Sequence, residues 1–146
     1  MATCKPFPLV AGFLRASRAV EGTPIEQVRA IWTAYARGGV DALREVVGDA
    51  PVEWVPLDED EPLPPEQFWG EWGRRRSEQV SIAVHWFEEH GPCVIAHGSM
   101  RTFSEGGFSD VQPSWVYCFR DEVLVYARAY PTREAAMEAV SRWQAA

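Results

Sequence analysis

The segment between residues 114 and 140 constrains the fold of this chain more than any other. Residues 115–119 alternate aromatic rings with smaller apolar side chains, a period of two that is typical of a strand with one buried face. A polar break at 120–122 separates this run from a second stretch of strand-forming residues at 123–130. Residues 133–143 are rich in Ala, Glu and Met, which favour a helix. The segment therefore predicts a β-hairpin followed by a terminal helix.

The β pattern begins well before this hairpin. Apolar residues alternate over 80–86, the Gly91-Pro92 pair predicts a turn, and 93–103 predicts a further strand. Residues 104–110 include two adjacent glycines and predict a loop into the final hairpin. Long strands joined by short turns favour an antiparallel sheet with helices covering one face.

The first half of the chain carries helix signals. Thr23-Pro24-Ile25-Glu26 combines an N-cap residue, a proline at the first helical position and the acidic residue of a capping box. Gly38-Gly39 predicts the end of this helix. The other elements predicted before the sheet are a second helix at 42–47, a strand at 52–55, an acidic, proline-rich loop at 58–65 and a third helix at 66–76. The order is α-α-β-α-β-β-β-β-α, and without repeats or linkers residues 23–146 are predicted to form one α+β domain.

Residues 1–22 are predicted to be an N-terminal extension. Lys5 precedes the apolar stretch 7–14, which weakly resembles a secretory leader, but the prolines, glycine and arginines in and around this stretch argue against one. We expect the extension to pack on the domain or on a partner subunit.

Composition disfavours several functional classes. The sequence is 47% hydrophobic and 24% charged, as in globular domains, and its net charge of −7 disfavours nucleic-acid binding, which depends on Lys and Arg. The basic cluster Arg74-Arg75-Arg76 ends a predicted helix, where cations suit the helix dipole.

No apolar run is long enough to span a membrane. Three cysteines without CxxC spacing and three histidines without ligand spacing indicate neither a disulfide framework nor a metal site, so we expect a reduced, cytoplasmic protein without a cofactor.

Four short motifs follow one another along the chain in a recognisable order. They are Gly38–Leu43, Val52–Pro56, Val116–Asp121 and Tyr130–Ala135. With the element order, they resemble the SnoaL-like group of the NTF2-like superfamily (cystatin-like α+β cone) over about residues 24–143. The resemblance implies a curved, mainly antiparallel sheet wrapped around the N-terminal helices, with a C-terminal helix, a conical apolar cavity, and a homodimer formed through the outer sheet face. One departure is Glu122, where relatives commonly carry Gly, and it predicts a different turn geometry.

The resemblance also allows a comparison with ketosteroid isomerase, whose chemistry needs an Asp base and an oxyanion hole of Tyr and protonated Asp. Trp54 occupies the position of the base, and Trp115 that of the second Asp. The Tyr position falls near Ile31, with Tyr35 one turn later. Steroid isomerisation is therefore not expected.

His97 is the main candidate for acid–base chemistry. It lies within a predicted strand, where a period of two places His97, Ser99 and Arg101 on one face. If that face lines the cavity, His97 can act as general base or acid and Arg101 can hold a carboxylate or a developing oxyanion. In the alternative arrangement, Ala96 and Met100 face inward and the polar trio faces solvent or a dimer partner.

Aromatic residues form the candidate wall of a ligand pocket. They are Trp32, Tyr35, Trp54, Phe68, Trp72, Trp115 and Tyr117. Such rings can surround a small hydrophobic or aromatic molecule, or they can simply fill an ordinary core. Asp58 or Asp60, just after the first predicted strand, could reach over the mouth of such a pocket as an acid or base.

Two functional hypotheses follow. In the first, the protein binds a small hydrophobic or aromatic molecule in the cone and performs cofactor-free proton transfer there, such as isomerisation, cyclisation or dehydration. In the second, it is a non-catalytic ligand-binding or dimerisation module. An open cavity with His97 or another titratable group on its wall supports the first, whereas a filled cone with His97 and Arg101 on the outer face contradicts it and leaves the second. A cavity that no ionisable group lines favours a carrier or sensor over an enzyme.

Overall fold

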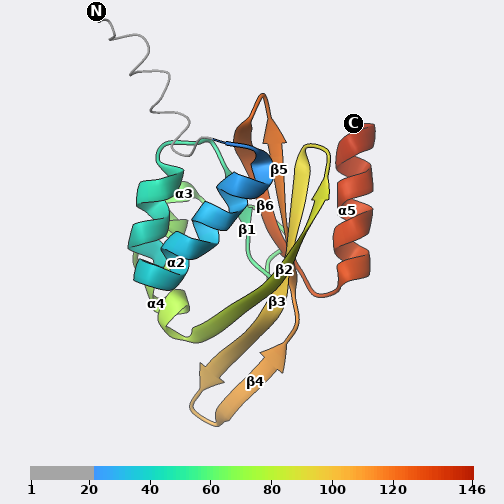
Figure 1. Cartoon of the computed structure of the whole chain (residues 1–146). Helices are drawn as coiled ribbons and strands as arrows, with labels where there is room; N and C mark the ends of the chain where they lie inside the picture. Colours follow the sequence, from blue (N-terminus) through green and yellow to red (C-terminus); the bar gives the residue numbers. More distant parts are fainter. Residues whose placement is uncertain (1–21) are drawn as a thin grey trace, which may run out of the picture.

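The computed structural model describes residues 22–146, which form a curved six-stranded sheet with helices on both faces. The predicted N-terminal extension lies outside the described residues, apart from Gly22. Helix α2 (Pro24–Val47) packs on one face of the sheet, called the concave face here, and α5 (Arg133–Ala145) packs on the other, the convex face (Figure 1). The N-terminal helices cover one face, as predicted, and the terminal helix adds a layer on the opposite face.

The sheet is mainly antiparallel, as predicted. Its strands are β1 (Glu53–Val55), β2 (Val80–His90), β3 (Cys93–Ser104), β4 (Gly107–Val111), β5 (Ser114–Arg120) and β6 (Val123–Tyr130). The order is β1-β6-β5-β3-β2, with β4 paired to the end of β3 and only the β1–β6 pairing parallel within the described part of the chain. Residues 104–110, predicted to be a loop, mostly belong to a β3–β4 hairpin that extends beyond the rest of the sheet (Figure 1). Every residue of β4 is exposed, so no burial pattern marks this strand in the sequence.

A β-bulge in β2 changes which residues share a face. The register with β3 shifts between Val84 and Trp86, so His85 is the additional residue. Simple alternation would place Trp86 on the same face as Val84. The bulge instead turns Trp86 to the convex face, where it lies opposite His97 and its ring stacks on the imidazole with the centroids 4.0 Å apart.

Helix α2 begins as its sequence predicts. The Thr23 hydroxyl accepts a hydrogen bond from the Glu26 backbone N–H, and the Glu26 carboxylate accepts one from the Thr23 N–H at 2.8 Å, which completes the capping box. Gly38 and Gly39 have non-helical backbone angles, and they kink the helix at the point where the sequence predicts an end. The part of the helix after the kink corresponds to the predicted second helix.

The predicted third helix consists of two shorter ones, α3 (Pro65–Phe68) and α4 (Glu71–Glu78). The two helices pack tightly at Gly73, because a Cβ on this residue would lie 1.9 Å from the carbonyl oxygen of Phe68. Only glycine allows this close approach. None of the helices in residues 22–146 is long and apolar enough to cross a membrane.

Two cores lie on opposite faces of the sheet. The concave core packs α2 against the sheet and includes Val28, Ile31, Leu43, Val47, Trp54, Val94, Ala96, Tyr117, Phe119 and Ala127. The convex core packs α5 against the sheet and includes Cys93, Ile95, Val116, Cys118, Tyr130, Ala136 and Val140. Successive residues of β3 and β5 therefore point into different cores. Cys93 and Cys118 lie directly opposite each other on these strands, with their sulfur atoms 2.9 Å apart.

The β5–β6 turn contains two non-glycine residues with positive φ. Asp121 has φ 52° and Glu122 has φ 66°, and Arg120 pairs with Val123 across this two-residue turn. Positive φ at both central residues characterises a type I′ hairpin turn, which normally contains Asn-Gly or Asp-Gly. Glu122 thus adopts the conformation that glycine favours, contrary to the different turn geometry that the sequence predicted. The Gln27 side-chain amide donates a hydrogen bond to the Glu122 carbonyl at 3.2 Å.

Candidate functional site

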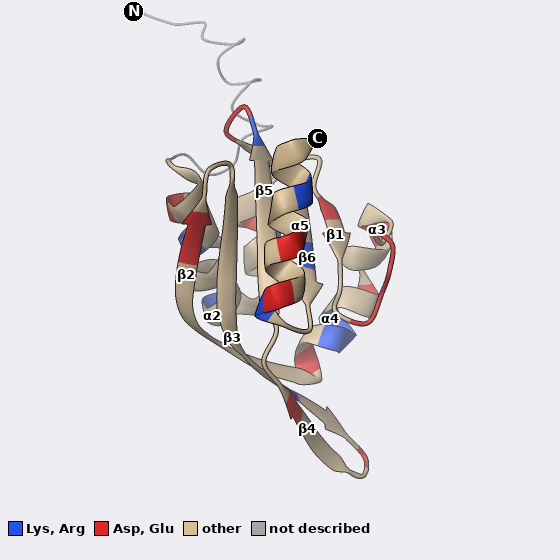
Figure 2. Cartoon of the chain, turned by 90° about the vertical axis from the view of Figure 1, so that its right-hand side faces the viewer, with Lys and Arg blue, Asp and Glu red and all other residues tan. Residues whose placement is uncertain are grey.

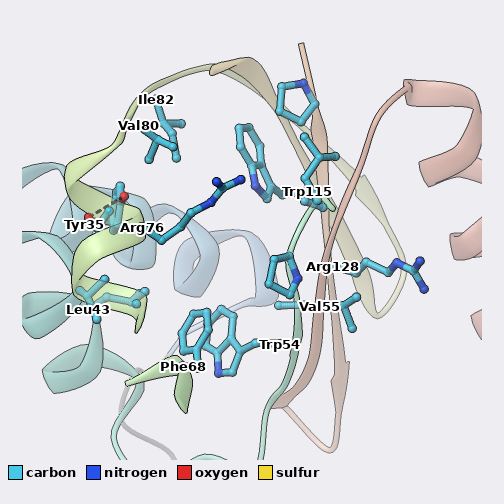
Figure 3. A pocket seen from close by; sticks show the side chains of 18 of the residues that line it. Tyr35, Leu43, Trp54, Val55, Phe68, Arg76, Val80, Ile82, Trp115 and Arg128 are labelled. Atoms are coloured by element: carbon cyan, nitrogen blue, oxygen red, sulfur yellow. Dashed lines mark hydrogen bonds between the residues drawn. The ribbon is translucent and has the colours of Figure 1, made fainter. Parts of the chain in front are cut away.

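The candidate site is a cavity between the concave face of the sheet and helices α2, α3 and α4 (Figure 3). Its volume is about 170 Å³. All seven residues of the aromatic wall predicted from the sequence line it: Trp32, Tyr35, Trp54, Phe68, Trp72, Trp115 and Tyr117. A second, more open hollow between α2 and β2 shares Trp32 and Tyr35 with this cavity. These rings therefore line an open cavity. Their contact with a ligand remains a prediction.

The aromatic side chains hold one another in place. The rings of Trp54 and Phe68 stack with their centroids 4.7 Å apart, and Figure 3 shows both at one end of the cavity. Trp32 contacts Trp115 edge to face, with the centroids 4.8 Å apart. Such pairs prefer these geometries because the ring faces are electron-rich and the edges electron-poor. The wall is therefore built from interlocked rings supplied by α2, α3, β1 and β5.

Polar groups on the wall are few and are mostly donors or hydroxyls. The hydroxyl groups of Tyr35 and Ser77 are hydrogen-bonded to each other at 2.9 Å. The indole Nε1 of Trp32 is buried and lies beside the Tyr117 hydroxyl. Burial raises the pKa of Tyr117 well above its usual range, with the Trp32 indole acting in the opposite direction. At neutral pH Tyr117 therefore stays a neutral phenol.

Two arginines line the cavity, and their side chains point in different directions. The guanidinium of Arg76 points into the cavity, whereas that of Arg128 points away from it (Figure 3) and lies over the ring of Tyr130 on the convex side. Arg76 donates a hydrogen bond to Asp58 at 3.4 Å, and Arg128 Nη2 lies 4.0 Å from Asp60. No Asp, Glu, His or Cys lines the cavity in the described part of the chain. Asp58 and Asp60 contact lining arginines but do not themselves belong to the wall.

His97 and Arg101 lie on the convex face and do not line the cavity. Their neighbours Ala96 and Met100 face the concave side, which is the alternative arrangement that the sequence left open. His97 is buried, with Nδ1 2.8 Å from the Ser114 hydroxyl. Arg101 is instead exposed and donates to Asp110 at 2.7 and 2.9 Å. The expectation that these two side chains act on a molecule in the cavity is therefore corrected: β3 alternation directs both away from it.

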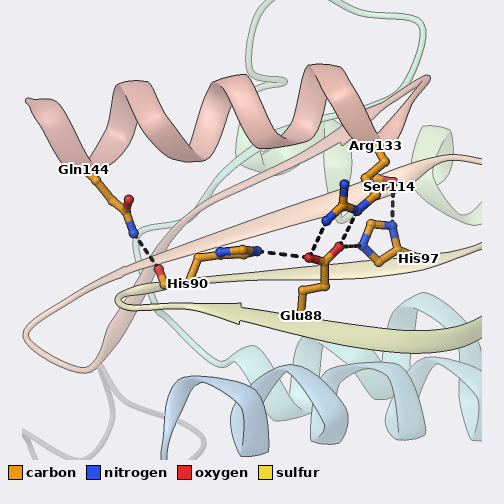
Figure 4. A network of polar contacts seen from close by, with 6 residues as sticks. All are labelled: Glu88, His90, His97, Ser114, Arg133 and Gln144. Carbon is orange, nitrogen blue, oxygen red and sulfur yellow. Dashed lines mark hydrogen bonds and ion pairs between the residues drawn. The ribbon is translucent and has the colours of Figure 1, made fainter.

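The convex face carries a polar network centred on Glu88 (Figure 4). Its carboxylate accepts two hydrogen bonds from Arg133 of α5, at 2.7 and 2.9 Å. It also contacts His97 Nε2 at 2.5 Å and His90 Nε2 at 3.2 Å. The Arg133 guanidinium is the main cause that lowers the pKa of Glu88 to about 2, with the two imidazoles adding to the effect. This network joins the terminal helix to β2 and β3, and is a structural feature of the fold.

The sequence interpretation missed the orientation of Arg76. The sequence pattern places Arg74, Arg75 and Arg76 together at the end of a helix, but of these three only Arg76 lines the cavity. Arg74 pairs with Asp41, and Arg75 with Glu71 one turn earlier on α4. The spacing could have shown this, because Arg76 follows Trp72 by four residues and so lies on the same helix face.

Comparisons with known proteins identify the fold. No family model matches the sequence, and no curated protein matches it. Among solved structures, an NTF2-like protein from Burkholderia thailandensis has a TM-score of 0.65 at 17% identity, covering 80% of this chain and 98% of its own. A putative SnoaL-like polyketide cyclase from a Jannaschia species has a TM-score of 0.55 at 12% identity, covering 84% of this chain and 96% of its own. An LEH-like epoxide hydrolase from Mycobacterium tuberculosis has a TM-score of 0.58 at 15% identity, covering 84% of this chain and 90% of its own.

These similarities confirm the predicted fold: the chain has the α+β cone of NTF2-like proteins, with the curved sheet around the N-terminal helix. At such low identity they show the fold alone, since one fold supports many functions. No group of three or more His, Cys, Asp or Glu side chains within residues 22–146 is arranged to hold a metal ion. Figure 2 shows acidic and basic residues interspersed on the face that carries α5, without a concentration of Lys and Arg there.

Proposed function

We propose that this protein binds a small hydrophobic or aromatic molecule in the conical cavity, as a carrier or sensor. The observation that supports this most is the cavity itself, whose wall is aromatic on α2, α3, α4, β1 and β5. Apolar walls with a few convergent polar groups are typical of ligand sites. An engineered cavity of about 150 Å³ in another protein holds benzene, so a volume of about 170 Å³ suits a molecule built on an aromatic ring.

Binding without catalysis fits the wall better than acid–base chemistry does. Proton transfer needs a group whose pKa lies near the working pH and which reaches the substrate. His97 faces the other side of the sheet, and burial keeps Tyr117 protonated. We therefore assign neither His97 nor Arg101 a catalytic role at the cavity. The similar folds of a putative cyclase and an epoxide hydrolase are compatible with a ligand cavity, and among residues 22–146 no carboxylate or imidazole lies on the cavity wall.

Native mass spectrometry of the purified protein tests the proposal, combined with tryptophan fluorescence during titration with 2-naphthoate and 2-naphthylmethanol. We expect saturable quenching of the wall tryptophans by at least one of the two compounds, or a co-purified molecule displaced by them. The proposal is contradicted if no molecule co-purifies and neither compound binds saturably.

We also propose that two copies of the chain associate through the convex face beyond α5. Three aromatic side chains remain exposed there: Trp86 (48%), Phe103 (49%) and Phe108 (58%). Exposed apolar patches of this kind often mark protein interfaces. Phe108→Ser is expected to shift the mass measured by light scattering from dimer to monomer, whereas Ser109→Ala in the same strand should not. A monomeric wild-type protein at all concentrations contradicts the dimer.

A cytoplasmic location is part of the same proposal, and the unpaired thiols of Cys93 and Cys118 support it.

A further inference from the structure

We propose that the cavity selects anionic aromatic molecules, and that Arg76 recognises their carboxylate. This inference rests on the proposed binding function and specifies the class of ligand. It follows from the position of Arg76, from its weak pairing with an exposed carboxylate, and from the lack of acidic side chains on the described wall.

The position of Arg76 follows from helical spacing. Trp72, Gly73, Arg76 and Ser77 of α4 all line the cavity. The close approach at Gly73 fixes α4 against the end of α3, so that this helix face is turned toward the sheet. The Arg76 side chain is 30% exposed, and its guanidinium points into the cavity (Figure 3). It is therefore accessible to a ligand, but much of its stem is shielded from water.

Arg76 has spare capacity to bind a carboxylate. A guanidinium has five N–H donors, and planar pairs of them match a carboxylate. In the described part of the chain the one hydrogen bond that it donates goes to Asp58, at 3.4 Å. The Asp58 side chain is 62% exposed, so water screens this contact. A ligand carboxylate held inside the apolar cavity would be screened less and would make the stronger pair.

The electrostatics of the wall also distinguish this site from the rest of the surface. The protein has a net charge of −7, so its average field repels anions. Among the residues that line the described wall, however, the charged group that points into the cavity is the Arg76 guanidinium. Recognition of an anion here would therefore be specific to the cavity.

The aromatic side chains of the wall complement the rest of such a ligand. Trp32 and Trp115 both line the cavity, with their ring centroids 4.8 Å apart, and flat apolar surfaces of this kind suit an aromatic ring. An aromatic acid combines the flat apolar surface and the negative charge that these rings and Arg76 complement.

Isothermal titration calorimetry with a matched pair of probes, 2-naphthoate and neutral 2-naphthylmethanol, tests the inference. We expect wild type to bind the acid about tenfold more tightly than the alcohol, as for a partly desolvated charge pair. Arg76→Gln should abolish this preference and leave binding of the alcohol within about twofold. Arg75→Gln is the control, because it removes the same charge from the exposed side of the same helix. Asp58→Asn should strengthen binding of the acid about twofold to fivefold by removing the competing carboxylate.

The outcomes separate this inference from the proposed function. If wild type binds the two probes equally well, or if Arg76→Gln behaves like Arg75→Gln, selection by Arg76 is overturned while cavity binding stands. If neither probe binds, and no co-purified molecule is found, both fall together. The preference of wild type and the effect of Asp58→Asn test the inference without the Arg76 variant, whose folding is checked by circular dichroism.

Discussion

The two faces of the sheet are built from the same strands, but one face lines a cavity and the other packs against a helix. On the concave face, alternate residues of β3 and β5 contribute to a wall of large rings that encloses a cavity with few internal hydrogen bonds. On the convex face, the intervening residues are smaller and pack solidly against α5, with a carboxylate-centred network at one end. The solid layer thus supports the hollow one. Substitutions on the convex face should mainly change stability, and substitutions on the concave face should mainly change binding.

The largest expected effect is on the convex core. Ile95 is fully buried under α5, and Ile95→Ala should lower the free energy of unfolding by about 3 kcal/mol through lost packing and a new cavity. Met100→Ala, on the cavity wall, should lower it by only about 1–2 kcal/mol, because its side chain already borders open space. Urea denaturation measures both. Equal losses of unfolding free energy in the two variants would contradict the distinction between a packed face and a face that borders a cavity.

The Glu88 network should make the convex face sensitive to acid. Because the pKa of Glu88 falls from an ordinary value of 4.5 to about 2 on folding, its stabilisation is complete above about pH 4.5 and is lost as the pH falls toward 2. Glu88→Gln should therefore be less stable than wild type at pH 7 by about 2 kcal/mol, and the difference should disappear near pH 2. Urea denaturation at several pH values measures it, and a difference independent of pH contradicts the assignment.

Two tryptophans provide a matched comparison of binding on one face with packing on the other. Trp115 lines the cavity, whereas Trp143 of α5 stacks on Tyr126 with the centroids 5.7 Å apart. Trp115→Leu should weaken binding of 2-naphthoate about tenfold, which corresponds to about 1.4 kcal/mol. Trp143→Leu should leave this affinity unchanged and lower the melting temperature instead. Calorimetric titration and thermal unfolding of both variants check the pair, and equal binding losses would count against the cavity.

The smallest expected effect concerns the turn that joins β5 and β6. Glu122→Gly should raise the free energy of unfolding by about 1 kcal/mol, because glycine adopts positive φ without steric strain. Asp121→Gly should raise it less, since Asp tolerates this region better than Glu. Thermal unfolding of the two variants measures the order, and destabilisation by Glu122→Gly would show that the side chain contributes more than the backbone strain.

Local signals in the sequence predicted much of the fold and the cavity wall. The capping box at Thr23 and the hairpin at 114–130 depend on residues close together in the chain. The seven aromatic residues could be predicted because they are large apolar side chains that the fold must bury. A period of two, however, assigns residues to two faces without showing which face is interior. The sequence therefore leaves the face of His97 open, and the positions of α2 and α5 determine it.

Other features depend on contacts between distant segments or on local irregularities. Glu88 and Arg133 are 45 residues apart, and no spacing rule connects them. The bulge at His85 reverses the alternation of β2, so Trp86 faces the side that the sequence pattern did not predict. Strand β4 is exposed throughout and pairs with β3 at the edge of the fold, so its sequence has no buried face that a period of two could show.

The facing thiols of Cys93 and Cys118 lie where a covalent link between two strands could form. Directly opposed residues of antiparallel strands have the Cα separation that a disulfide requires. A disulfide oxidant that accepts two electrons and two protons from the pair would join β3 covalently to β5 beneath α5. The strands that carry Met100 and Trp115 on their other face would then be cross-linked, and the cavity would have a stiffer wall in oxidising surroundings than in reducing ones.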